Sequence, residues 1–200
     1  MFWCHNVREF SDMFWRNFLK YSQCYITCVP PGGDLPFGFM FTESFESLTM
    51  IYRAQFGKLP DSFLDVGCAD GRMMTHAQKL GVRRVYGIDN AKYPHARHEN
   101  IEIVSVSNYR AQEQFDLCWV NAVLPYLSEK SVANALKKLN CARMIIAKHY
   151  TYEDLRDSWF NFDTEGMLSK DCNWWLVQFQ MAGFQSWYDK CRECFVAVRG

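Results

Sequence analysis

The sequence predicts an α/β fold: a seven-stranded, mostly parallel sheet with helices on both faces and an antiparallel hairpin at the C-terminal end. Three observations predict it. From Pro60 onward, short apolar runs typical of buried strands alternate with segments of helical periodicity. A glycine turn over 67–71 connects the first strand to a helix. The last two strands follow each other through a short connection, which favours a hairpin over a parallel crossover.

The length and the charge balance narrow the class of protein. The chain has 200 residues, 49% of them hydrophobic, and its 22 basic and 22 acidic residues give no net charge. It is therefore long enough for one ordinary core and too apolar for a disordered chain. No run approaches 18 apolar residues, so no membrane span is expected. The neutral balance provides no general attraction to nucleic acid. The start of the chain lacks the pattern of a signal peptide, which predicts a cytoplasmic location.

The N-terminal part of the sequence reads as a helical extension. Apolar residues recur at helical spacing over 5–22, and a loop follows from Pro30. A second helix is expected from Thr42 or Ser44 to Gly57. We expect 1–58 to form this extension and to serve as a lid over a substrate. The alternative is that its aromatic residues, like those between strand five and the last helix, pack on the sheet.

The C-terminal part, 59–200, is expected to hold the sheet. Its predicted strands share short apolar runs: 62–66, 82–88, 101–106, 116–120, 142–148, 185–189 and 193–199. Its predicted helices share apolar positions at a period of 3.6 residues: 72–80, 128–139 and 173–181.

The cysteines allow a metal site but do not require one. There are nine of them, an odd number, so complete internal pairing is impossible. The pairs Cys24–Cys28 and Cys191–Cys194 have spacings that zinc sites use. Because no spacing brings the two pairs together, we favour reduced, mostly buried thiols and no metal.

The turn after the first predicted strand is the most informative segment. Gly67 and Gly71 are four residues apart, and position 69 is an alanine, so the turn lacks the G-x-G-x-x-G spacing of a dinucleotide site. Asp65 precedes the first glycine by two residues. Its carboxylate would repel a pyrophosphate and attract a cationic ligand. The second strand ends at Asp89, a position that suits hydrogen bonds from ribose hydroxyls.

These segments resemble a known family. LDVGCADG (64–71) and VYGIDN (85–90) resemble the first two cofactor motifs of class I S-adenosylmethionine-dependent methyltransferases. The segments 114–124 and 142–148 resemble the family's fourth and fifth strands, and 174–198 resembles its closing helix and last two strands. The resemblance covers about 60–200. It implies a Rossmann-like fold, S-adenosylmethionine as the cofactor and methyl transfer as the activity.

The resemblance also implies which residues contact the cofactor. They share positions at or just beyond the carboxyl ends of strands one to four: Asp65, Gly67, Cys68, Ala69, Gly71, Asp89, Asn90, Ser107, Asn108, Asn121 and Ala122. The first five would hold the amino-acid part of the cofactor. Asp89 would bind the ribose hydroxyls, and Asn90 would lie near the adenine. Ser107 or Asn108 would contact the adenine amine, and the last two would lie beside the sulfonium.

The acceptor side is less specified by the sequence. Strand five ends near His149 and Tyr150, which we predict to be catalytic: His149 as a general base and Tyr150 as a wall of the acceptor pocket. The alternative is that His149 only hydrogen-bonds to the backbone. Asn121 is followed by Ala-Val-Leu and not by the Pro-Pro-Tyr/Phe pattern of nucleic-acid amino-methyltransferases. The sequence therefore predicts methyl transfer to a small-molecule or peripheral acceptor. The alternatives are a catalytically silent cofactor binder or scaffold and, less favoured, a nicotinamide-dependent enzyme.

Overall fold

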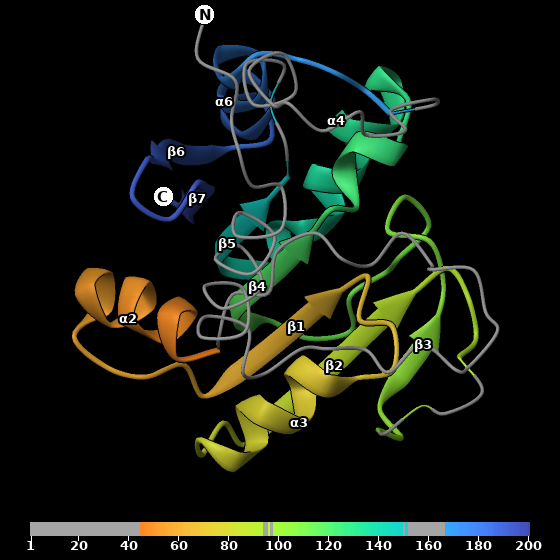
Figure 1. Cartoon of the computed structure of the whole chain (residues 1–200), viewed down its shortest axis with the longest axis vertical. Coiled ribbons are helices and arrows are strands. Elements are labelled where there is room, and N and C mark those ends of the chain that lie inside the picture. The colour runs from red at the N-terminus through yellow and green to blue at the C-terminus, as the bar shows by residue number, and fades with distance from the viewer. Residues whose placement is uncertain (1–44, 94–95, 97, 150, 152–166) are drawn as a thin grey trace, which may run out of the picture. The chain divides into compact units, whose positions relative to one another are not determined.

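The computed structural model describes residues 45–93, 96, 98–149, 151 and 167–200 (Figure 1). The chain divides into two compact units, Met1–Ser44 and Phe45–Gly200, and every element below belongs to the second. Because 1–44 lie outside the described residues, the predicted N-terminal lid stays a prediction. The second helix predicted for the extension does form, as α2, and it falls in the unit that contains the sheet.

The seven-stranded sheet is confirmed, with the strand order β3-β2-β1-β4-β5-β7-β6. The strands are β1 (Ser62–Val66), β2 (Arg84–Asp89), β3 (Ile101–Ile103), β4 (Phe115–Asn121), β5 (Ala142–Lys148), β6 (Phe184–Asp189) and β7 (Cys194–Arg199). The first five are mutually parallel. Strand β7 runs antiparallel between β5 and β6, so the predicted C-terminal hairpin is confirmed at one edge.

The helices of the described residues alternate with these strands (Figure 1). They are α2 (Phe45–Phe56), α3 (Arg72–Lys79), α4 (Glu129–Lys138), α6 (Cys172–Met181) and the short 3-10 turns η1 (Leu124–Tyr126) and η2 (Leu139–Cys141). Side chains cap two of the N-termini: Ser128 Oγ accepts from the amide of Ser131 at 3.3 Å, and Asp171 Oδ1 accepts from the amide of Trp174 at 2.7 Å. No helix in the described part of the chain is long and apolar enough to cross a membrane.

Strand alternation divides the sheet into two buried faces. One face contributes Leu64 and Val66 of β1, Cys118 and Val120 of β4, and Ile145 and Ala147 of β5 to one apolar cluster. Helix α4 covers this face through Val132 and Leu136, and α6 covers it through Trp175 and Phe179. We call it the α6 face.

Helices α2 and α3 cover the opposite side of the sheet, which we call the α3 face. The ring of Phe45 in α2 meets Phe63 of β1 edge-on, with ring centroids 4.8 Å apart. Helix α3 lies close enough to β2 that a Cβ added at Gly87 would come within 2.5 Å of the Met74 sulfur and 2.7 Å of the Cys68 sulfur. The absence of a side chain at Gly87 therefore allows the start of α3 to pack closely against β2.

The third strand is shorter than the sequence predicts. Apolar residues continue to Val106, but β3 ends at Ile103. Beyond it the amide of Val104 still bonds to the carbonyl of Asp89, and the chain then turns, with the amide of Tyr109 bonded to the carbonyl of Ser105. The buried Val106 and Tyr109 join the core from this turn, so their hydrophobicity reflects burial in a turn and not strand pairing.

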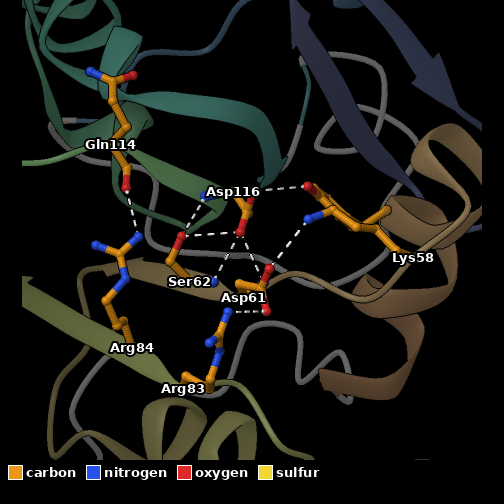
Figure 2. Close-up of polar contacts among 8 residues, drawn as sticks. Lys58, Asp61, Ser62, Arg83, Arg84, Gln114 and Asp116 are labelled. Carbon is orange, nitrogen blue, oxygen red and sulfur yellow. Dashed lines mark hydrogen bonds and ion pairs between the residues drawn. The ribbon is translucent and has the colours of Figure 1, made fainter.

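A polar cluster ties the amino ends of β1 and β4 to α2 (Figure 2). Asp116 Oδ2 accepts from the amides of Asp61 and Ser62 at 2.8 and 3.1 Å, and Asp116 Oδ1 accepts from the Tyr52 hydroxyl at 3.1 Å. The Ser62 hydroxyl donates to the same carboxylate and accepts from the Asp116 amide. Burial, and then Asp116, raise the pKa of Tyr52 to about 12. The cluster lies at the strand ends opposite the predicted cofactor residues.

Candidate functional site

The sheet register brings the predicted cofactor residues into one row at the carboxyl ends of the strands. Val66 pairs with Ile88 on one side and with Val120 on the other, so the next residue, Gly67, follows β1 between Asp89 and Asn121. Asp65, Asp89 and Asn121 lie on the α3 face, because their neighbours in sequence belong to the α6 face. In open α/β sheets this edge is where ligands bind.

Backbone hydrogen bonds shape the glycine turn. The amides of Gly67 and Cys68 both donate to the carbonyl of Ile88, at 2.8 and 3.2 Å, and the amide of Gly71 donates to the carbonyl of Cys68. Gly67 and Gly71 have φ of 77° and 81°, and Ala69 has φ of 49°. The turn thus requires three left-handed residues, and the alanine is the one that adopts this conformation at a steric cost.

The open side of the turn is Gly67, the exposed residue that follows buried β1. A Cβ added there would lie 2.4 Å from a methyl group of Val123, in the segment after β4. Only glycine lets the β1 turn and the β4 segment approach so closely.

Asp89 is held in place by the turn that it faces. Its carboxylate accepts from the amide of Ala69 at 2.9 Å through Oδ2, and from the amide of Ala91 at 3.0 Å through Oδ1. Each carboxylate oxygen can accept a second hydrogen bond. Asp89 can therefore orient the turn and still accept two hydroxyl groups from a ribose.

The electrostatics of the site favour a positively charged ligand. Asp65 is 3% exposed and lies near Asp89 and Asp70. Burial, followed by the charges of these two carboxylates, raises its pKa to about 8. Burial likewise raises the pKa of the Cys68 thiol, which makes this cysteine a poor nucleophile. Asp70 is paired with Arg72 at 2.7 Å, whereas Asp65, with its raised pKa, keeps its proton at neutral pH until a positively charged group lies near it.

Asn121 and Ala122 follow β4 next to the glycine turn, and their predicted place beside the sulfonium stays a prediction. Both are partly exposed, and Ala122 has φ of 53°. Its amide donates to the carbonyl of Lys148 at 2.8 Å, which ties the end of β4 to the end of β5. Two of the three non-glycine residues with positive φ in the described part of the chain, Ala69 and Ala122, thus lie at the carboxyl edge of the sheet.

The predicted adenine residues are more exposed. Asn90, directly after Asp89, and Asn108 are exposed, and Ser107 is partly exposed. The carbonyl of Ser107 accepts from the Asn134 side chain of α4 at 3.0 Å, which fixes the turn after β3 against this helix. Their contact with adenine stays a prediction.

His149 follows β5, as predicted, but its side chain lies on the α6 face. It is 4% exposed, stacks on Phe195 with centroids 4.9 Å apart, and lies 4.2 Å from the Trp175 ring. Burial lowers its pKa to about 3. Among the described residues, neither of its ring nitrogens nor Trp175 Nε1 has a hydrogen-bond partner. Its role as a base stays a prediction, and Tyr150 lies outside the described residues.

Three further residues lie near this edge of the sheet and were not predicted from the sequence. Lys148 pairs with Asn121 and is buried on the α3 face. A Cβ added at Gly71 would lie 2.9 Å from the Cβ of His98, so the loop after β2 returns over the turn. In that loop Tyr93 lies near the cofactor carboxylates: burial first, and then Asp89, Cys68 and Asp70, raise its pKa. For Lys148 the sequence did offer a signal, because a polar residue ends an apolar strand there. The contacts of His98 and Tyr93 have no signal in the sequence.

The structure offers no metal site among the residues that it describes. No three His, Cys, Asp or Glu side chains gather there as possible ligands. Cys191 is exposed and Cys194 is buried at the start of β7. Cys24 and Cys28 lie outside the described residues.

Comparisons with known proteins agree with this geometry. Residues 64–145 match the family model described as a methyltransferase domain, whereas no curated protein matches the sequence. Among solved structures, DesVI of Streptomyces venezuelae is similar, with a TM-score of 0.69, 13% identity, and coverage of 99% of this chain and 100% of that one. The 1,6-didemethyltoxoflavin-N1-methyltransferase of Burkholderia thailandensis, solved with S-adenosylhomocysteine, has a TM-score of 0.60 and 13% identity, with coverage of 100% and 92%.

A third structure is the plantazolicin methyltransferase BpumL in complex with SAH. Its TM-score is 0.56 and its identity 18%, and the match covers 68% of this chain and 61% of BpumL. At these identities the three structures establish the fold. The matched family model spans β1, the glycine turn, Asp89 and the end of β4, which are the parts that form the row at the sheet edge. Residues 64–145 are therefore similar to a methyltransferase domain, and the chain shares its fold with these three structures.

Proposed function

We propose that this protein transfers the methyl group of S-adenosylmethionine to a small-molecule acceptor bound beyond β4 and β5. The observation that carries the proposal is the row formed by Asp89, Gly67 and Asn121 at the carboxyl edge of the sheet. In this row the two carboxylate oxygens of Asp89 can accept hydrogen bonds from hydroxyl groups. The turn at Gly67 exposes main chain, and Asn121 supplies a side-chain amide.

The proposed roles of the cofactor residues follow from their chemistry. Asp89 accepts hydrogen bonds from the two ribose hydroxyls while its other lone pairs hold the turn. Asp65 lies below the turn, where the positive charge of the cofactor's amino group would favour loss of the Asp65 proton and then pair with the carboxylate. The main chain of Gly67, Cys68, Ala69 and Gly71 surrounds the amino-acid part, because the turn has little side-chain bulk.

Methyl transfer from a sulfonium needs little chemical assistance from the protein, because the cofactor is already activated. A lone pair of the acceptor forms a bond to the methyl carbon, the carbon–sulfur bond breaks, and its electron pair returns to sulfur to give S-adenosylhomocysteine. A proton leaves the acceptor only where the methylated group carries one. The contribution of this chain is alignment and exclusion of water around the line from sulfur to acceptor. Asn121 and Ala122 are the residues proposed to border that line.

The acceptor class is supported by charge. With no net charge on the chain, the protein has no general attraction to a polyanion. One similar structure is named for 1,6-didemethyltoxoflavin and contains it, which shows that this fold accommodates an acceptor of that size.

We also propose that His149 acts on the acceptor as a neutral imidazole. Its low pKa keeps it uncharged at neutral pH. An unpaired polar ring in an aromatic cluster costs stability, and such costs are typical of functional positions. An acceptor that reaches past the end of β5 would offer the ring a hydrogen bond.

Calorimetry with S-adenosylhomocysteine tests the cofactor site. We expect wild type to bind it and Asp89→Ala to lose at least ~10-fold in affinity, because two hydroxyl hydrogen bonds to a charged group disappear. Glu193→Gln, a charge removal at an exposed site in the β6–β7 turn, should bind like wild type. Failure of wild type to bind would refute the proposal. A turnover assay distinguishes a methyltransferase from a catalytically silent cofactor binder. The silent binder would bind S-adenosylhomocysteine but would not form it from S-adenosylmethionine with any acceptor.

A further inference from the structure

Tyr93 is an exposed aromatic residue on the loop that follows β2. Its side chain is 39% exposed. A single exposed aromatic residue is common on protein surfaces and indicates no binding site by itself. Tyr93 differs from such a residue in two respects. Its loop is attached to the proposed cofactor site on both sides of it, and its phenol interacts with three groups of that site.

The loop is fixed to the site before and after Tyr93. Before it, the amide of Ala91 donates to Asp89 Oδ1 at 3.0 Å. After it, the loop passes close to the glycine turn, where a Cβ added at Gly71 would lie 2.9 Å from the Cβ of His98. Asp89 ends β2, and Gly71 directly precedes α3. The loop therefore holds Tyr93 between the end of β2 and the start of α3.

The electrostatic neighbours of the phenol place it beside the glycine turn. Burial, and then the charges of Asp89, Cys68 and Asp70, raise the pKa of Tyr93, so the phenol is uncharged at neutral pH. Cys68 and Asp70 belong to the turn, and Asp89 ends β2. In the sheet, β1 separates β2 from β4. Tyr93 therefore lies toward the β2 side of the turn, away from Asn121, which ends β4.

This position fits one part of the cofactor. Asp89 is proposed to accept the ribose hydroxyls, which would place the nucleoside at the end of β2, whereas the methyl group would lie beside Asn121. An aromatic ring next to a nucleoside gains from stacking on the base or packing on the sugar. It also gains from the removal of its own apolar surface from water. Tyr93 has exposed surface that such a contact would cover.

We propose that the Tyr93 ring packs against the nucleoside of the bound cofactor and holds it on the glycine turn. The inference rests on the proposed function, and it adds a cofactor-binding residue that no sequence motif indicates. The ring provides the contact, and the hydroxyl group is not required. Phenylalanine should therefore replace tyrosine at this position, whereas alanine should not. The amino-acid part of the cofactor should not depend on Tyr93.

The test divides the cofactor into its parts. Calorimetry measures the binding of S-adenosylhomocysteine and of methylthioadenosine, which keeps the nucleoside and lacks the amino-acid part. We expect wild type to bind both, and Tyr93→Ala to weaken both by the same factor of at least ~5, the value of one contact between a base and an aromatic ring. Tyr93→Phe should bind both like wild type. Trp187→Ala, which removes a similarly exposed aromatic residue from β6, should also bind like wild type.

A second measurement leaves the ring in place. In protein labelled with fluorotyrosine, the fluorine NMR signal that disappears in Tyr93→Phe belongs to Tyr93. We expect methylthioadenosine to shift this signal in the labelled wild-type protein, because the nucleoside changes the surroundings of the ring.

Four results would overturn the proposal: no binding of methylthioadenosine to wild type, unchanged affinities in Tyr93→Ala, a loss for S-adenosylhomocysteine that methylthioadenosine does not share, or a Tyr93 fluorine signal that methylthioadenosine does not shift. The first and last do not use Tyr93→Ala, so a folding defect in that variant leaves the proposal open to refutation. S-adenosylhomocysteine binding is measured first. If wild type does not bind it, the proposed function fails and this inference falls with it. If wild type binds it and any of the four results is found, only the role of Tyr93 is wrong.

Discussion

At the scale of single residues, Asp65 links the cofactor site to pH. Its pKa is raised from 3.8 to about 8 in the folded protein. Between these values the folded state keeps a proton that the unfolded state has lost. The free energy of unfolding should therefore fall as pH rises from about 4 to 8, by at most ~1.4 kcal/mol per pH unit from this group.

Urea unfolding of the cofactor-free protein across this pH range measures the effect. Asp65→Asn should reduce the decline in the free energy of unfolding, because the asparagine side chain does not titrate in this pH range. Glu193→Gln, an exposed change, should keep it. A decline of the same size in Asp65→Asn would show that another group causes it.

Ala69 holds backbone strain that a glycine would relieve. Its φ of 49° costs an alanine about 1–2 kcal/mol, whereas glycine is more flexible when unfolded and recovers only part of this. We expect Ala69→Gly to raise the free energy of unfolding by about 0.5–1 kcal/mol. Ala133→Gly, inside α4, should lower it by a similar amount. Destabilisation by both variants would contradict the strain at Ala69.

His149 should show opposite effects on stability and activity. His149→Phe keeps an aromatic ring against Phe195 and Trp175 and removes two unpaired nitrogens. We expect the free energy of unfolding to rise by about 1–2 kcal/mol. The rate of methyl transfer should fall while product affinity stays the same. A more stable variant with full activity would leave His149 with only a packing role.

At the scale of elements, α2 and the sheet are joined at the edge opposite the cofactor. Asp116→Ala would leave two backbone amides, the Ser62 hydroxyl and the Tyr52 hydroxyl without their acceptor. We expect a loss of about 3 kcal/mol or more in urea unfolding, because these donors lose a charged partner. Tyr52→Phe removes one of the bonds and should cost about 1 kcal/mol.

The same pair of variants separates stability from binding. Because this cluster lies at the amino ends of the strands, affinity for S-adenosylhomocysteine should stay the same in any Asp116→Ala protein that remains folded. A selective loss of affinity would mean that the two edges of the sheet are coupled.

At the scale of the whole molecule, ligand binding should stabilise the second unit. A ligand at 100 times its dissociation constant adds about 2.7 kcal/mol to the free energy of unfolding. For a chain of this size, that is a rise in Tm of about 5–10 °C. Thermal unfolding with S-adenosylhomocysteine should show this rise, and Asp89→Ala should lose it. A similar rise with NADH in its place would favour a nicotinamide enzyme.

The sequence determined the order and type of most elements and the place of the glycine turn that we propose to bind the cofactor. Strands β1, β2, β4 and β5 are mostly apolar because the sheet is buried on both faces, so short apolar runs in the sequence reveal them. Asp65, Gly67 and Asp89 could be named because turn chemistry is local. The third strand was predicted to extend to Val106, but β3 ends three residues earlier. An apolar run indicates burial, and Val106 is buried in a turn.

Only the tertiary structure decided what lies beside what at the carboxyl edge. The face of the sheet on which His149 and Lys148 lie depends on strand direction and register, and a shift of one residue would exchange their faces. The approach of Val123 to Gly67 and of His98 to Gly71 joins segments far apart in the sequence. Local sequence patterns report propensity and burial, whereas such contacts arise from how the strands pair. The residues of the proposed cofactor site could therefore be named from the sequence, whereas the contacts between distant segments became known only from the fold.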